Sequence, residues 1–203
     1  SYLHEKQTGL FYYIISIYNQ SYTILINDNC ELLWQKYIDQ RVTRQTFSDK
    51  SNFLSMFVGE TPTSSHGDMI TFDLNGDLVS RISGISAGGY PIEIFEDYEL
   101  LVVHDRQKTW VCNFKTGEII NEYQKGGEYL SYCPTKNYLL KAMSYSNQIR
   151  FSLYDMDDMI RIRSVSTYSN SSILGSILDF SISHDGTQVS ILTDNMFTKI
   201  ELK

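Results

Sequence analysis

The residue types of a hydrolytic triad occur close together in this sequence, at Ser64, Ser65, His66 and Asp68. In such a triad a serine hydroxyl attacks the substrate, a histidine takes its proton, and a carboxylate orients the histidine. Those roles need side chains that are separated in space and braced by the surrounding fold, whereas these residues follow one another in one short stretch. We therefore predict no catalytic residues and no enzymatic activity.

Possible ligands for a metal ion are also poorly placed. Asp155, Asp157 and Asp158 carry the carboxylates that calcium prefers, but the stretch lacks the glycine and terminal glutamate of an EF-hand loop. The four histidines and three cysteines are dispersed and show no spacing typical of a zinc site or a disulfide framework. We expect a charged turn at 155–158 and neither a metal nor a cofactor.

The elements that would position these residues are strands. Short apolar runs separated by polar turns cover most of the chain, and none shows a sustained helical period. The 15 Tyr and 10 Phe favour strands, and there are only 3 Pro to interrupt them. Ile149, Phe151 and Leu153 alternate with polar residues, as on a strand with one buried face. The pattern predicts an all-β fold.

Two kinds of hairpin repeat along the chain. The first consists of a tight turn, an acid and a new strand, at 27–33, 73–79, 114–120 and 154–160. Its acids are Glu31, Asp77, Glu118 and Asp158, which lie 46, 41 and 40 residues apart. The second kind falls between these copies, at 47–54, 95–100, 132–139 and 182–189. A period of about 40 to 45 residues is that of a four-stranded propeller blade.

The hairpins resemble the repeats of known β-propellers. The second kind resembles the polar first turn of WD40-type blades, and the stretches 27–34 and 115–118 resemble quinoprotein-type repeats. This resemblance implies a single domain over residues 1–203, a small β-propeller of about five antiparallel blades. The first and last blades each lack a strand, so the ring is incompletely closed, residues 1–9 supply a strand, or the chain is part of a larger propeller. A β-sandwich is the structural alternative.

The overall charge limits the partners. A formal net charge of −7 repels phosphate groups, so we do not expect direct binding to nucleic acid. The apolar run at 10–17 is too short to span a bilayer, and no signal peptide is evident, so no membrane association is expected. We therefore expect a cytoplasmic, monomeric protein.

The propeller assignment places the acidic turns at one end of the blades. The predicted partner-binding residues are Glu31, Asp77, Glu96, Asp97, Glu118, Asp155, Asp157 and Asp158. Such a face attracts a basic protein and speeds its association. The alternative interpretation is structural, because acids are common in tight turns.

The sequence favours a non-catalytic, protein-binding propeller. In size and charge the chain resembles bacterial immunity proteins, and this resemblance implies a basic toxin nuclease as the partner. One alternative is a scaffold propeller, or a fragment of one, in a larger assembly. The other is a ligand-binding or enzymatic propeller with a site in its central channel.

Overall fold

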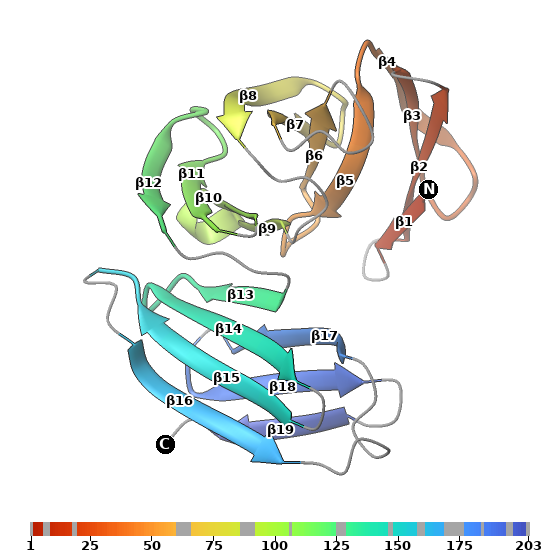
Figure 1. Ribbon diagram of the computed structural model, residues 1–203. Coiled ribbons are helices and arrows are strands. Elements are labelled where there is room, and N and C mark those ends of the chain that lie inside the picture. Colours follow the sequence, from red (N-terminus) through yellow and green to blue (C-terminus); the bar gives the residue numbers. More distant parts are fainter. Residues whose placement is uncertain are drawn as a thin grey trace. The chain divides into compact units, whose positions relative to one another are not determined.

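The computed structural model describes residues 2–5, 9–17, 20–59, 66–85, 92–105, 107–124, 129–145, 148–157, 161–168, 177–183, 185–193 and 197–201. Over these residues the protein consists of nineteen strands and one short 3-10 helix. The strands form five separate antiparallel sheets, and in each sheet the strands pair in chain order (Figure 1). The chain divides into two compact units, one of Ser1–Asp105 and Thr109–Glu122, the other of Arg106–Lys108 and Tyr123–Lys203.

The first unit contains three sheets. Sheet I consists of β1 (Tyr2–Glu5), β2 (Leu10–Ile17), β3 (Gln20–Ile26) and β4 (Leu32–Ile38). Sheet II consists of β5 (Arg41–Phe47), β6 (Phe53–Gly59), β7 (Gly67–Asp73) and β8 (Leu78–Ile85). Sheet III consists of β9 (Ile92–Phe95), β10 (Leu100–His104), β11 (Thr109–Asn113) and β12 (Ile119–Tyr123), with the 3-10 turn η1 (Glu96–Tyr98) between its first two strands.

The second unit contains two sheets. Sheet IV consists of β13 (Tyr129–Cys133), β14 (Tyr138–Tyr145), β15 (Gln148–Asp155) and β16 (Arg161–Tyr168). Sheet V consists of β17 (Ile177–Ile182), β18 (Gln188–Thr193) and β19 (Phe197–Glu201). Within the described residues sheet V therefore has one strand fewer than the others.

Alternating side chains build the cores between neighbouring sheets. In β3, Thr23 and Leu25 are buried while Tyr22, on the opposite face, is exposed. The core between sheets I and II contains Tyr12 and Leu25 from one side and residues such as Leu54 and Met56 from the other. Burial of these side chains is the main favourable contribution to folding.

Sheet II has a core on each face. Leu54 and Met56 face sheet I, whereas Phe57 and Met69 belong to a second core shared with sheet III. In the second unit the core between sheets IV and V includes Leu140, Phe151 and Val189, as well as residues from β13 and β17. Within each unit the sheets are thus blade-like layers, and sheets I and II, II and III, and IV and V pack face to face.

The fold confirms the all-β prediction and the expectation of about five antiparallel blades. It also shows where the N-terminal residues lie: β1 pairs with β2 from Tyr2 opposite Tyr13 to Glu5 opposite Leu10, so it completes sheet I. The five sheets are separate, each being a blade-like meander, and do not form the two sheets of a β-sandwich. The prediction of a single domain over 1–203 stays a prediction.

Candidate functional site

The third and fourth strands of each four-stranded sheet of the first unit are joined by a tight turn that ends in an acid. The backbone carbonyls of Glu31, Asp77 and Glu118 accept hydrogen bonds of 3.1, 3.1 and 2.8 Å that close the three turns. Their side chains are exposed. Over the residues that the structure describes, no lysine or arginine pairs with any of the three carboxylates. The turns therefore present three negative charges to solvent, one from each sheet.

Three residues that the sequence analysis did not single out hold these turns in shape. The side-chain oxygens of Asn27, Asp73 and Asn113 each accept a hydrogen bond from the backbone N–H two residues later, at 2.9 to 3.1 Å, and Asp155 does the same in the corresponding turn of sheet IV. This Asx turn is a local preference of Asn and Asp. The signal was present in the sequence as an Asn or Asp near the start of each repeated turn.

Exposed aliphatic side chains follow the acids. Leu32 is 55% exposed, Leu78 is 59% exposed and Ile119 is 43% exposed, and each comes directly after Glu31, Asp77 or Glu118. We call these six residues the acidic turn edge: Glu31, Leu32, Asp77, Leu78, Glu118 and Ile119. It combines charges that act at long range with apolar surface that is available for contact.

Two lysines in turns of the first unit are paired with other acids. Lys50 forms an ion pair with Asp97, and Lys115 forms one with Glu99 at 2.8 Å. The hydrogen bond from Lys115 to Glu99 holds the pKa of that carboxyl below its usual value. The paired acids, including the predicted site residue Asp97, therefore contribute little net charge.

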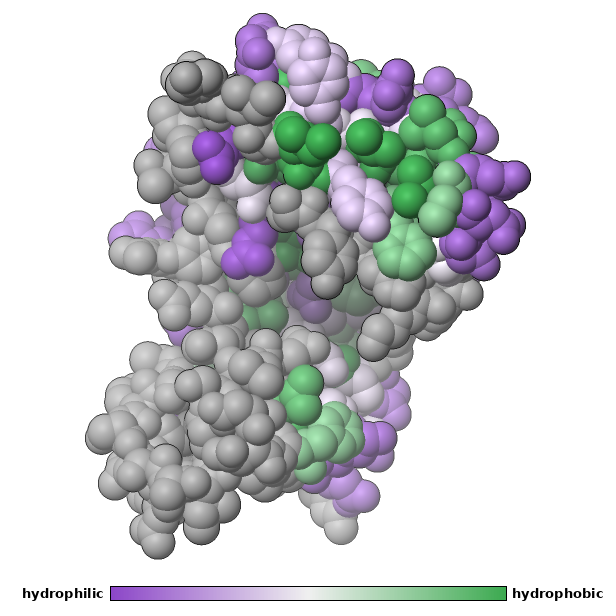
Figure 2. Space-filling view, turned by 90° about the vertical axis from the view of Figure 1, so that its right-hand side faces the viewer, coloured by the Kyte–Doolittle hydropathy of each residue, from purple (hydrophilic) through white to green (hydrophobic). Residues whose placement is uncertain are grey.

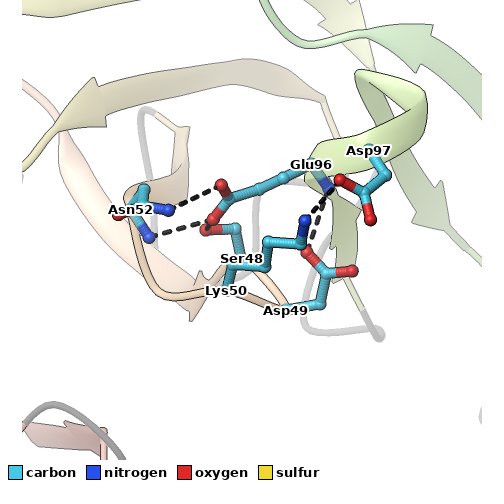
Figure 3. A network of polar contacts seen from close by, with 6 residues as sticks. All are labelled: Ser48, Asp49, Lys50, Asn52, Glu96 and Asp97. Carbon is cyan, nitrogen blue, oxygen red and sulfur yellow. Dashed lines mark hydrogen bonds and ion pairs between the residues drawn. The ribbon is translucent and has the colours of Figure 1, made fainter.

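Glu96, another predicted site residue, connects two sheets. Figure 3 shows its carboxylate pointing to the turn between β5 and β6, where Ser48 and Asn52 donate hydrogen bonds to it. The backbone N–H of Glu96 in turn donates to the Asp49 carboxylate at 3.0 Å. These contacts join sheet II to sheet III, so Glu96 has a structural role in addition to its charge.

The hydrogen bonds determine the ionisation of Glu96. Partial burial opposes the charged form, but the donors Ser48 and Asn52 outweigh that effect and lower the pKa of Glu96 from its ordinary value. Glu96 therefore stays ionised to lower pH than an isolated glutamate.

The remaining predicted residues belong to the second unit. Asp155 forms the Asx turn of sheet IV, and the exposed Asp157 accepts a hydrogen bond of 2.5 Å from the Asn137 side chain. Asp158 lies outside the described residues. The structure thus brings Glu31, Asp77, Glu96, Asp97 and Glu118 into one unit.

The residues considered for catalysis lie outside the acidic turn edge. The Asp68 carboxylate accepts a hydrogen bond of 2.6 Å from Arg81, and His66 is exposed just before β7. His104 is fully buried, with its Nδ1 atom 2.9 Å from the Thr109 hydroxyl and its Nε2 atom 3.6 Å from the Glu93 carboxylate. Among the described residues no group of three His, Cys, Asp or Glu is arranged to hold a metal ion.

Comparison with known proteins bears only on the fold. No protein-family model and no curated protein matches the chain. Among solved structures it is similar to a chain of hydrazine synthase from Kuenenia stuttgartiensis, with a TM-score of 0.62 and 13% identity. The match covers 96% of this chain and 60% of that chain. No helix within the described ranges is long and apolar enough to cross a membrane.

Proposed function

We propose that this protein is a non-catalytic binding module of the β-propeller type, and that its acidic turn edge recognises a basic protein. The observation that carries the proposal is the repetition of one arrangement in three successive sheets. Each turn holds an exposed acid followed by an exposed aliphatic residue. The Asx turns fix the turn geometry in advance, so less conformational entropy is lost on binding.

The two kinds of side chain have different tasks. At physiological salt, carboxylates attract a basic surface over distances of up to about 10 Å. This attraction mainly raises the association rate. Aliphatic contacts then slow dissociation, because burying apolar surface contributes about 25 cal/mol per Å² before the costs of association. The proposed partner therefore has basic side chains beside an apolar patch.

The partner class that we favour is a basic toxin nuclease, with this chain as its immunity protein. The support is the net charge of −7, the acidic turn edge and the modest length of 203 residues. Inhibition in this proposal is steric and electrostatic, since acids that bind where nucleic acid binds exclude the phosphate backbone.

Co-expression tests this proposal. A basic nuclease domain encoded beside the gene for this chain is expressed in host cells with and without the chain, and growth and nucleic-acid integrity are measured. We expect the wild-type chain to restore growth. We expect the triple variant Glu31→Lys, Asp77→Lys and Glu118→Lys to fail while it remains folded. Unrestricted toxicity in the presence of the folded wild-type chain would exclude the immunity role.

A scaffold function is the second candidate. It is supported by three exposed apolar side chains on sheet I, those of Ile15, Tyr22 and Tyr37, and by the likeness to a longer chain, of which this one matches 60%. In that case the chain co-purifies at fixed stoichiometry with a stable assembly, and substitution of the three acids leaves the assembly intact.

A further inference from the structure

One turn of the first unit contains the only Asn–Gly pair in the sequence, Asn75–Gly76. It joins β7 to β8 in sheet II and leads into Asp77 of the acidic turn edge. Asn75 is exposed, and Gly76 has a φ angle of +82°, a conformation that suits glycine. This pair holds the two groups that react in deamidation, which are a side-chain amide and a backbone nitrogen whose own residue has no side chain to hinder attack.

The reaction uses only this pair and water. The Gly76 nitrogen attacks Cγ of the Asn75 side chain and closes a succinimide ring. The new N–Cγ bond replaces the bond from Cγ to the amide nitrogen, which takes up the Gly76 proton and leaves as ammonia. Water then opens the ring at one of its two carbonyls, and the product at position 75 is aspartate or isoaspartate.

In the folded turn the attacking nitrogen is engaged. The Gly76 N–H donates a hydrogen bond of 3.0 Å to the backbone carbonyl of Asp73, and the Asn75 N–H donates one of 2.9 Å to the Asp73 carboxylate. Gly76 is also buried, and a Cβ built on it would lie 2.8 Å from the Trp34 ring. The reaction therefore needs a local opening that releases the Gly76 N–H, and such openings occur in folded proteins at a free-energy cost set by local stability.

We propose that Asn75 is a site of spontaneous deamidation in this protein, and that opening of the turn at 73–77 sets its rate. Deamidation adds a negative charge two residues before Asp77, so it changes the charge beside the acidic turn edge without any change in the gene. The proposal is independent of the proposed function, because the reaction depends only on the turn and on water.

The product weakens the turn that forms it. The Asn75 side-chain amide lies 3.5 Å from an oxygen of the Asp73 carboxylate. After deamidation to aspartate a second carboxylate takes the place of this amide, and two like charges face each other. Isoaspartate also lengthens the backbone by one methylene inside the turn that the hydrogen bond from Gly76 to Asp73 closes.

The corresponding turn of sheet I provides a comparison within the same chain. Asn29 is exposed, and its backbone N–H donates a hydrogen bond of 3.1 Å to the Asn27 side chain. The next residue, Cys30, donates its N–H to the Asn27 carbonyl at 3.0 Å. Sheet I faces the viewer in Figure 2, where purple side chains lie around green and pale ones in the first unit. Because Cys30 has a side chain beside its nitrogen, we expect Asn29 to persist.

Peptide mapping by mass spectrometry tests the proposal on the full chain, incubated in mildly alkaline buffer and, in parallel, in urea. We expect aspartate and isoaspartate to accumulate at position 75 in both samples, and faster in urea, while Asn29 stays intact over the same time. An Asn75 that stays intact in the folded protein, or that reacts no faster than Asn29, would overturn the proposal. Equal rates in buffer and in urea would overturn the role of the turn.

Melting temperatures test the effect of the product. Asn75→Asp reproduces one product and should lower the melting temperature. In an Asp73→Asn background, which has the residue type found in the turns of sheets I and III, the same substitution should lower it less, because it meets no second carboxylate. Asn29→Asp, beside the neutral Asn27, is the matched control and should have a smaller effect than Asn75→Asp. Equal losses in the two backgrounds would contradict the repulsion assigned to Asp73.

Discussion

Asn52 donates two hydrogen bonds to the carboxylate of Glu96, from its backbone N–H at 2.9 Å and from its side-chain amide at 2.8 Å. Asn52 belongs to the turn that starts β6, and Glu96 begins the turn η1 of the next sheet. Ser48 donates a third hydrogen bond to the same carboxylate. A charge that the sequence assigns to partner binding thus also connects two sheets.

Glu96→Gln should destabilise the protein at neutral pH by about 1 kcal/mol, the typical net contribution of one hydrogen bond. Because folding lowers the pKa of Glu96 from its ordinary value of 4.5, its stabilising effect is present above that value and is lost as pH falls through the folded pKa. The stability difference between wild type and variant, from urea unfolding, should therefore shrink below about pH 4.5. Asp97→Asn is the control and should cost less, because the Lys50–Asp97 pair is exposed. A difference that does not vary with pH would contradict the assignment.

Gly76→Ala should destabilise the protein more than Gly84→Ala. Both glycines have positive φ angles, +82° and +78°, so alanine costs about 1 kcal/mol or more of backbone strain at either position. Only at Gly76 would the new Cβ meet another group, the Trp34 ring at 2.8 Å, whereas nothing lies within 4 Å at Gly84. Trp34 itself is held between Tyr12 and Phe72. Thermal unfolding measures the stability of both variants. Equal losses of stability would show that the turn can shift and relieve the contact with Trp34 at little cost.

Deletion of residues 1–9 should lower the melting temperature and promote aggregation. The deletion removes β1, which pairs with β2 over four residue pairs, and it leaves the edge of β2 unpaired. Differential scanning calorimetry and light scattering measure the two effects. If stability and solubility stay unchanged, β1 contributes nothing to sheet I.

Reversal of single charges should show whether the acidic turn edge attracts the partner. Glu118→Lys should slow association with the proposed basic partner and weaken the dependence of the association rate on salt concentration, as measured by surface plasmon resonance. Glu201→Lys in sheet V changes the net charge equally and should have a smaller effect. Equal effects of the two substitutions on the association rate would indicate that only the net charge of the protein matters. The acidic turn edge would then not be the binding site.

The class of fold and the positions of most hairpins could be predicted from the sequence, because they depend on interactions between residues close together in the chain. A turn closed by Asn27 and Glu31, or by Asp73 and Asp77, is stabilised within five residues, so its signal survives in the sequence. Strand β5, the first of sheet II, has no apolar run in its sequence, because in Arg41–Phe47 only Val42 and Phe47 are buried. The packing of β5 beside β6 makes it a strand despite its polar pattern.

Contacts between residues distant in the sequence decided the rest. The sequence predicts the same environment, an acidic turn, for Glu96 and Glu118. In the structure Glu96 accepts hydrogen bonds from the turn between β5 and β6 of sheet II, whereas Glu118 remains exposed. Likewise the alternation of Tyr12 with Tyr13 predicts two faces and does not distinguish them. Burial of Tyr12 against sheet II leaves Tyr13 on the opposite face of sheet I. Periodicity is a property of one strand, whereas the identity of its neighbours is set only when the sheets stack.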